Sequence, residues 1–306
     1  MFEEIVMIYY FDIHRTSVFK PMFEKSGVIH RNQFRSPFML RAMSFPGFYR
    51  LPSALFYSTP KFTKGDDKII IFDTYSTPRM VDWLCKNWPD KRIIFWYWNP
   101  VNGSRLRERV PKRVEFWSYS KEDCKKFGFR YNTQFFFDCL SAKAELCRAS
   151  NARNPVAKAL FIGREKGRAG DLNTLAMQLR EAGAEPDFRI MRRPEGRYVS
   201  IREKLMPYSE VVDMAMGADI LVDYSLNPAS GLSLRPMEAL FFGKKLITNN
   251  SEILSADFYS PSNIYVLGHD NRTLREFVEC PGTEVLPEVR DGYLLSNWLK
   301  RFDESL

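Results

Sequence analysis

The chain has 306 residues, of which 45% are apolar and 15% aromatic, and its formal net charge is +8. This composition favours packed cores over intrinsic disorder, and the length predicts two domains of ordinary size. No stretch approaches the roughly 18 consecutive apolar residues of a membrane-spanning helix, and the acidic start, followed by a short β-like run, is not typical of a signal peptide.

In chain order, strands and helices alternate through both halves. The first half predicts strands at 5–11, 68–73, 92–98 and 114–118 and helices at 77–87, 103–109 and 121–127. The second half predicts strands at 157–162, 188–192, 219–224, 245–248 and 264–267 and helices at 171–182, 208–216, 233–242 and 291–303. Continuous Val, Ile and Phe runs separated by helices indicate parallel sheets covered on both faces.

The predicted fold class is α/β, with two Rossmann-like, doubly wound parallel-sheet domains that face each other across a cleft. The polar stretch "RASNARNPV" near 148–156 precedes a fresh strand and is a candidate boundary. We therefore expect domains at 1–150 and 151–306, and the last helix could cross back to the first domain.

Cysteine and histidine usage gives no sign of a metal site. The five cysteines are scattered without C-x-x-C spacing, and the three histidines lie far apart. We therefore expect a reduced, cytoplasmic protein with no disulfide framework, no metal and no cofactor.

The positive charge is concentrated in the first half. Residues 1–150 carry 25 Lys and Arg against 15 Asp and Glu, whereas residues 151–306 have a net charge of −2. The segment 25–65 has no acidic residue and mixes aromatic residues with basic ones, including Arg31, Arg35, Arg41 and Arg50. Such a surface suits lipid headgroups or an anionic acceptor, although the same pattern fits an irregular loop with solvated charges. No nucleic-acid-reading motif accompanies it.

The turn after the first strand of the second half is glycine-rich and basic. It reads "FIGREKGRAGDL", and Arg164, Lys166 and Arg168 stand just before a predicted helix start. A helix N-terminus and positive side chains together suit a phosphate. The turn is neither a Walker A loop nor G-x-G-x-x-G, so a solvated basic turn is the alternative.

The stretch "SGLSLRPMEALFFGKKLITNN" at 230–250 combines a glycine loop with an unusual helix start. Ser233 is a predicted N-cap, and the amides of 231–233 could hold an anion. Arg235 opposes the helix dipole at this end, and Glu238 lies on the same face, three residues on. A phosphate near Arg235 would reverse the unfavourable sign, and Glu238 could accept hydrogen bonds from a ribose. The alternative is a surface ion pair worth a few tenths of a kcal/mol.

With "DFYSPSNIYV" following it, this stretch resembles the donor-binding region of bacterial GT-B-type glycosyltransferases of the lipopolysaccharide and capsular polysaccharide biosynthesis group. The resemblance covers most of the chain but is specific only at about 227–266. It implies a donor-binding second domain, with Gly231, Leu232, Ser233 and Arg235 near the diphosphate and Glu238 on the ribose. Arg164, Lys166 and Arg168 correspond to the second phosphate contact.

The implied function is transfer of a hexose-type sugar, from a donor expected to be UDP-linked, to a growing surface glycan without a metal. The first domain would bind the acceptor, and the protein could sit peripherally on the cytoplasmic face of the inner membrane. Many retaining members carry another glutamate at the position occupied here by Ser230. The alternatives are therefore a non-catalytic glycosyltransferase-like scaffold subunit or another nucleotide-sugar enzyme such as an epimerase.

An inverting transferase also needs a base that takes the proton of the acceptor hydroxyl. Candidates follow the first-half strands: Asp12 and His14 after the first, and Asp73 after "IIIF". Each could cap a turn instead, and a retaining enzyme needs no such base.

Overall fold

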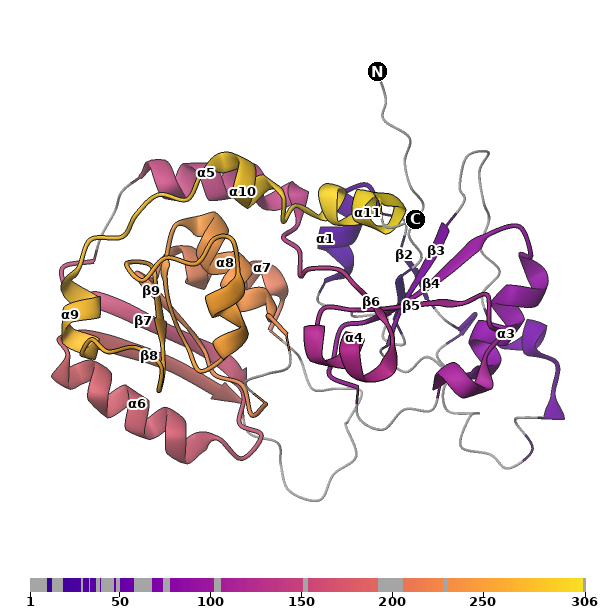
Figure 1. Ribbon diagram of the computed structural model, residues 1–306, viewed down its shortest axis with the longest axis horizontal. Coiled ribbons are helices and arrows are strands. Elements are labelled where there is room, and N and C mark those ends of the chain that lie inside the picture. Colours follow the sequence, from indigo (N-terminus) through magenta and orange to yellow (C-terminus); the bar gives the residue numbers. More distant parts are fainter. Residues whose placement is uncertain are drawn as a thin grey trace. The chain divides into compact units, whose positions relative to one another are not determined.

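The computed structural model forms two compact units, Met1–Asn132 and Thr133–Leu306, each built around a parallel sheet (Figure 1). It describes residues 10–12, 19–28, 30–32, 34–36, 39, 47, 50–57, 68–73, 78–101, 106–150, 154–191, 206–227 and 231–304. The α/β class with two parallel sheets is as the sequence predicted. None of the helices in these ranges is both long and apolar enough to cross a membrane.

The division between the units falls earlier in the chain than the predicted 150/151. The segment 133–150 groups with the second unit because its aromatic residues pack there. The ring of Phe136 stacks on Phe241, with ring centroids 4.1 Å apart, and Phe135 contacts Trp298 at 4.8 Å. This aromatic packing places the segment 133–150 in the second unit.

In the first unit, four parallel strands lie in sequence order: β3 (Lys68–Phe72), β4 (Arg92–Tyr97), β5 (Glu115–Ser118) and β6 (Arg130–Tyr131). A separate parallel pair consists of β1 (Tyr10–Asp12) and β2 (His30–Asn32). The helical elements are α1 (Lys20–Lys25), η2 (Ser53–Leu55), α3 (Pro78–Asn87), η3 (Leu106–Arg109) and α4 (Lys121–Phe127). Alternate residues of β3 and β4 face α3, and both strands are almost wholly buried, as their continuous apolar runs predict.

In the second unit, five parallel strands take the order β11-β10-β9-β7-β8. They are β7 (Ala157–Arg164), β8 (Ala184–Met191), β9 (Ile220–Asp223), β10 (Lys245–Thr248) and β11 (Ile264–Val266). The helical elements are η4 (Asp138–Leu140), α5 (Ser141–Ala149), α6 (Ala169–Glu181), α7 (Tyr208–Met216), α8 (Leu234–Phe242), η5 (Ser251–Ser255), α9 (Leu274–Glu279), α10 (Pro287–Asp291) and α11 (Leu295–Glu304).

The strand order defines where this sheet binds ligands. The chain moves outward from β7 to β8 on one side and from β9 to β11 on the other, so the order reverses between β7 and β9. In doubly wound sheets ligands bind outside the carboxyl ends of the strands at such a switch point. The turn after β7 and the loop after β9, which the sequence analysis singled out, therefore start at neighbouring strand ends.

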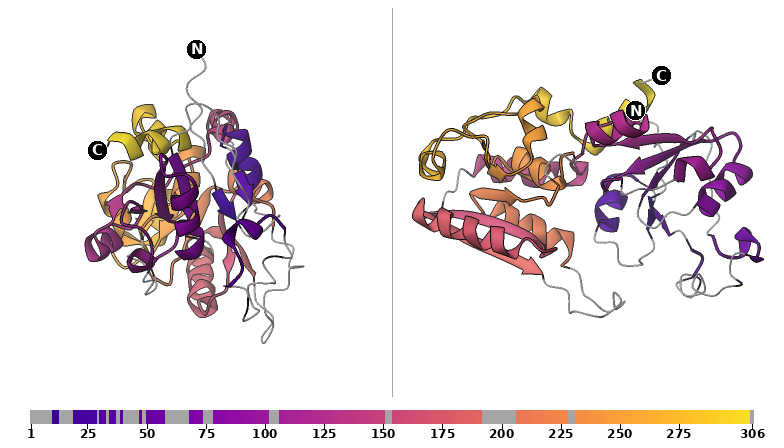
Figure 2. Two further views of the ribbon diagram at one scale, coloured as in Figure 1. Left: turned by 90° about the vertical axis from the view of Figure 1, so that its right-hand side faces the viewer. Right: turned by 60° about the horizontal axis from the view of Figure 1, so that its bottom comes forward.

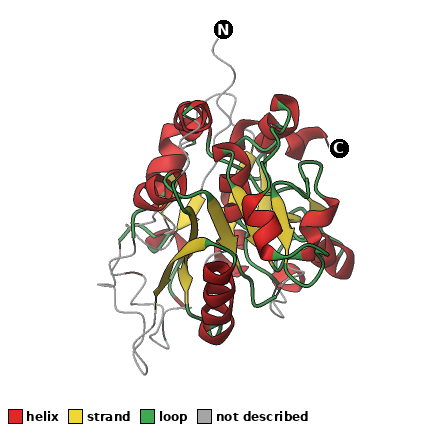
Figure 3. Ribbon diagram, turned by 90° about the vertical axis from the view of Figure 1, so that its left-hand side faces the viewer, coloured by secondary structure: helices red, strands yellow, loops and turns green. Residues whose placement is uncertain are grey.

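Helices cover both faces of this sheet (Figure 3), and α6 runs along β7 and β8 (Figures 1 and 2). Ile220 and Val222 of β9 point into the core formed with α6 and α9. Because side chains alternate along a strand, Asp223 points to the opposite face, where α8 lies. The strand period thus places a carboxylate beside the start of α8.

Most predicted elements of the second unit and β3, β4, β5, α3 and α4 of the first are confirmed within a few residues. The strand expected at 188–192 begins at Ala184, because β8 is an outer strand and tolerates Pro186. The helix expected at 291–303 is α11, which begins four residues later, and a separate short helix, α10, precedes it. Helix α5 was missed, since its exposed Leu146 and single buried residue, Ala144, give a weak apolar stripe.

The end of α8 generates a prediction about stability. Gly243 has φ 65°, and a Cβ there would lie 3.0 Å from Cγ of Arg148. We expect Gly243→Ala to lower the free energy of unfolding by about 1–2 kcal/mol, the cost of a left-handed residue. Gly217→Ala is the matched control, because Gly217 ends α7 with φ −78° and has ordinary space for a Cβ. Equal destabilisation of both variants in urea unfolding would contradict the prediction.

Candidate functional site

The turn after β7 is tight and presents a lysine to solvent. The N–H of Arg168 donates to the carbonyl of Glu165 at 3.0 Å. The two residues between them, Lys166 and Gly167, have φ values of 49° and 83°. A left-handed lysine is uncommon and costs conformational energy. The turn nevertheless keeps Lys166 exposed at the carboxyl edge of the sheet.

Arg168 ties the ends of β7 and β9 together. Its Nε and Nη2 donate to the carbonyl of Arg164 at 3.1 and 3.0 Å, and its Nη1 donates to the carbonyl of Tyr224. The guanidinium lies 4.9 Å from the ring centre of Phe161. A Cβ at position 163 would lie 2.8 Å from Nη2, so Gly163 makes room for this side chain. Arg168 therefore fixes the switch point, a role beyond the phosphate contact expected from the sequence.

The loop after β9 is held by side chains that follow β10. Gly231 is buried with φ 80°. Its carbonyl accepts from Nδ2 of Asn250 at 2.6 Å, and its N–H donates to Oε1 of Glu252 at 3.2 Å. The sequence analysis expected the Gly231 amide to bind an anion, and the carboxylate of Glu252 already accepts its hydrogen bond.

Ser233 caps α8 as predicted. Its Oγ accepts from the N–H of Arg235 at 3.1 Å and donates to Oδ1 of Asp223 at 3.0 Å. Thr248 donates to the other oxygen of Asp223 at 3.4 Å. Burial raises the pKa of Asp223, while these hydroxyls and the nearby Arg235 and Arg168 oppose the rise. Asp223 thus lies within electrostatic range of two arginines that the sequence analysis assigned to the donor. The sequence analysis missed it as a site residue, although it ends a predicted strand.

Arg235 and Glu238 form an ion pair within the first turns of α8. The side chain of Glu238 is only 2% exposed and that of Arg235 12%. The second carboxylate oxygen of Glu238 accepts from the hydroxyl of Tyr208 at 2.8 Å. Burial raises the pKa of Glu238, whereas Arg235 and Tyr208 stabilise its charged form. The pair is therefore not the casual surface pair that was the alternative reading of the sequence.

This arrangement places positive charge and a buried hydrogen-bond acceptor side by side. The start of α8 offers its partial positive charge, Arg235 and the exposed Lys166 supply cationic groups, and Glu238 supplies a buried acceptor one turn into the helix. The carbonyl of Leu232 accepts from Nε2 of the buried Gln134 at 3.3 Å. The segment that precedes α5 thus also holds the loop before α8 in place.

Asp73 follows β3 in the first unit and binds the segment after β4. Its carboxylate accepts from the N–H of Trp98 at 3.2 Å and from the N–H of Asn99 at 3.1 Å, and also from the Asn99 side chain. Burial raises the pKa of Asp73 to about 6 in spite of these bonds. Such a group is ionised at neutral pH and basic enough to accept a proton. The predicted base candidate also acts as a loop cap.

The remaining candidates are only partly described. His14 and Arg41 lie outside the described residues, as does Ser230, and for Asp12 and Arg31 only the backbone, in β1 and β2, is described. Arg35 is exposed, and its Nε donates to the carbonyl of Tyr57 at 3.0 Å. Arg50 is exposed beside η2.

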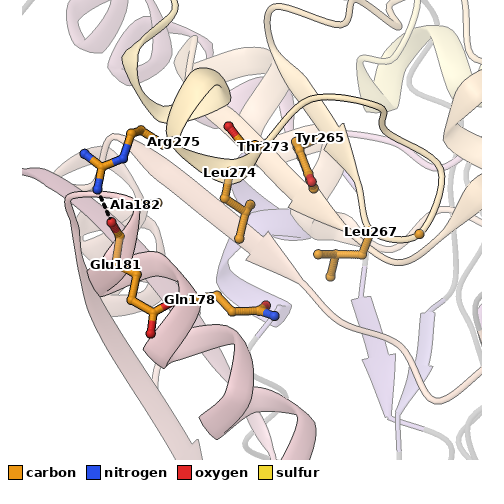
Figure 4. Close-up of a pocket in the computed structure, with 9 residues that line it drawn as sticks. Gln178, Glu181, Ala182, Tyr265, Leu267, Thr273, Leu274 and Arg275 are labelled. Atoms are coloured by element: carbon orange, nitrogen blue, oxygen red, sulfur yellow. Dashed lines mark hydrogen bonds between the residues drawn. The ribbon is translucent and has the colours of Figure 1, made fainter.

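A separate depression of about 470 Å³ lies on the second unit (Figure 4). Its lining comes from the end of α6 and from the segment joining β11 to α9, where Arg275 donates to the carbonyl of Glu181. None of the predicted site residues lines it. Among the described residues, no group of three or more His, Cys, Asp or Glu could hold a metal ion.

A comparison with models of known protein families finds no match, and no curated protein matches the sequence. Solved structures are similar over nearly the whole chain. The N-terminal domain of trehalose-6-phosphate phosphatase from Candida albicans has 10% identity and a TM-score of 0.52 over 99% of this chain and 96% of that one. At this identity the likeness shows the shared fold alone.

Two glycosyltransferase structures align more loosely. The lipopolysaccharide outer core galactosyltransferase WaaB has 12% identity and a TM-score of 0.49, with 99% of each chain covered. An α-glucosyltransferase in complex with UDP and a DNA 13-mer has 12% identity and a TM-score of 0.47, covering 98% of this chain and 89% of that one.

The Asp73 environment predicts a directly measurable titration. We expect the side-chain carboxyl carbon of Asp73 to titrate near pH 6 in an NMR experiment, above the ordinary range for Asp, because burial disfavours its charge. Asn99→Ala removes a donor that stabilises the charged form and should move the midpoint higher still. A midpoint near 4 in the wild-type protein would contradict the described burial.

The Glu252–Gly231 contact predicts competition between a carboxylate and a phosphate. Replacing Glu252 by Gln keeps an acceptor for the Gly231 amide but removes a negative charge. If the loop holds a diphosphate, as the sequence analysis expects, Glu252→Gln should bind UDP about 5-fold more tightly, with uridine unchanged, since one like-charge repulsion in a water-like dielectric is worth about 1 kcal/mol. Glu185→Gln, at the amino end of β8, is the control. Weaker UDP binding by Glu252→Gln in calorimetry would sink this interpretation.

Proposed function

We propose that this protein is a glycosyltransferase that moves a sugar from a nucleotide donor, UDP-linked by preference, to a growing bacterial surface glycan. The observation that carries the proposal is the buried Arg235–Glu238 pair at the start of α8, beside the switch point of the second sheet. A buried ion pair is weak as a stabilising device, because desolvation offsets most of its attraction. The Arg235–Glu238 pair lies next to a capped helix start and a glycine loop. This position suits the phosphates at one end of a nucleoside diphosphate and the ribose at the other.

In this proposal the donor rearranges the ion pair. The guanidinium of Arg235 turns from Glu238 to the diphosphate, and the released oxygen of Glu238 accepts a hydrogen bond from the ribose diol. Lys166 and Arg168 add positive charge at the neighbouring strand end. These cations and the helix dipole offset the charge on the leaving diphosphate, so the proposal invokes no metal.

The acceptor side of the proposal rests on the first unit. Arg35 and Arg50 are exposed, and beside them Leu51 and Leu55 are 49% and 54% exposed. Cationic and apolar side chains together favour the interface of an anionic membrane, which supports a lipid-linked glycan of the lipopolysaccharide, O-antigen or capsule class as acceptor. In an inverting reaction, Asp73 would take the proton of the acceptor hydroxyl.

A non-catalytic scaffold subunit is the second candidate, favoured by Ser230, which stands where many retaining glycosyltransferases carry a glutamate. Thermal shift with UDP, CMP, GDP and dTDP, followed by nucleotide release from sugar donors with a membrane glycan extract, separates the two. Nucleotide binding without release would support the scaffold, and binding of none of them would end the proposed donor site.

The two members of the pair have separable roles. We expect Glu238→Gln to weaken UDP and uridine alike, about 10-fold or more, because a hydrogen bond to a charged acceptor is lost. Arg235→Gln should weaken UDP much more than uridine, because uridine has no phosphate. Both affinities would be measured by calorimetry.

The control for these variants is Arg272→Gln, which removes a guanidinium paired with Asp270 elsewhere in the same unit. It should leave both affinities unchanged. Melting temperatures of the ligand-free variants identify any that fail to fold. Equal losses of uridine affinity in the Arg235 and Glu238 variants would show that the roles are misassigned.

A further inference from the structure

Tyr208 touches the site from a different helix. It is the first residue of α7, is 5% exposed, and donates its hydroxyl proton to Oε1 of Glu238 at 2.8 Å. Its ring packs edge-on against Phe137, with centroids 5.7 Å apart. The ring is therefore held by packing that does not involve the hydroxyl, and the hydroxyl is aimed at the carboxylate.

The two partners of Glu238 differ in what they can do. The guanidinium of Arg235 is carried by a flexible aliphatic chain, and the side chain is 12% exposed. It can therefore turn toward a ligand phosphate. When it does, a carboxylate that is 2% exposed loses its cation, and an unpaired buried charge is costly. The hydroxyl of Tyr208 is carried by a rigid, buried ring. Tyr208 therefore keeps its hydrogen bond to Glu238 when Arg235 turns away.

We propose that Tyr208 is the positioning residue of the nucleotide site: it holds Oε1 of Glu238 so that Oε2 faces the ribose once Arg235 has turned away. The inference rests on the proposed function, because it concerns how the same site recognises a ribonucleoside. Recognition of the diol then depends on two helices, with Glu238 on α8 contacting the ligand and Tyr208 on α7 acting through it.

The hydrogen bond from this hydroxyl also favours the charged form of Glu238, against the burial that raises its pKa. Removing the hydroxyl therefore raises the pKa of Glu238. The other titratable or charged groups that act on the pair are Arg235 on α8, Asp223 at the end of β9 and Cys139 on η4. None of these changes when Tyr208 is replaced by Phe, so a shift in pH dependence reports on the hydroxyl itself.

The test is Tyr208→Phe, which keeps the ring and deletes only the hydroxyl. Affinities for uridine and for 2′-deoxyuridine would be measured by calorimetry between pH 5.5 and 8. We expect the wild-type protein to prefer uridine, and the variant to lose about 5- to 10-fold in uridine affinity with little change for 2′-deoxyuridine. Because the pKa of Glu238 is higher in the variant, Glu238 is protonated at a higher pH. As the pH is lowered, the variant should therefore begin to lose uridine affinity at a higher pH than the wild-type protein does.

Tyr293→Phe is the matched control, because it deletes a tyrosine hydroxyl that donates to the carboxylate of Asp257 at 2.6 Å in the same unit. It should leave the preference for uridine intact. If Glu238→Gln abolishes the preference and Tyr208→Phe does not, the positioning role is overturned and the proposed function stands. If the wild-type protein binds no nucleoside or nucleotide, the proposed function and this inference fall together.

Discussion

The second unit is organised around one constraint, the burial of a carboxylate. Glu238 is 2% exposed in a helix whose next residues are wholly apolar. A buried charge requires partners, and this one has a cation from its own helix and a hydroxyl from α7. The packing of α7 on α8 therefore also brings the carboxylate its hydroxyl partner. A helix that needed only to fill the core would carry an aliphatic residue there.

The switch point depends on a second set of polar contacts, made mostly to backbone. Arg168 bonds the carbonyls that end β7 and follow β9. Asn249 bonds the N–H and the carbonyl of Ser225 at 2.8 and 2.7 Å and so ties β9 to β10. Backbone groups at strand ends lose their ladder partners and must find others. Side chains that satisfy them also make the edge rigid, which is what a ligand-binding edge requires.

Local features of the sequence predicted what depends on local physics. The apolar runs of β3, β4 and β7, the Ser233 cap and the spacing of Arg235 and Glu238 all follow from periods and caps. The partners Tyr208, Asp223 and Glu252 could not be predicted, because each lies ten or more residues from the group it contacts and topology decides which distant residue arrives. Arg168 shows the converse limit: its charge is evident in the sequence, but the strand order decides that the carbonyl of Tyr224 lies within its reach.

The outer strand β8 has a consequence for the protein in solution. Among the described strands it has a neighbour only on the β7 side, and a bare strand edge is a template for pairing with another chain. Pro186 removes one donor from the strand, and Asp187 and Arg189 pair with each other beside it at 2.9 Å. Proline and charge discourage a second copy from adding its own strand. Pro186, which made the start of this strand hard to predict from the sequence, thus also disfavours edge-to-edge pairing between copies of the chain.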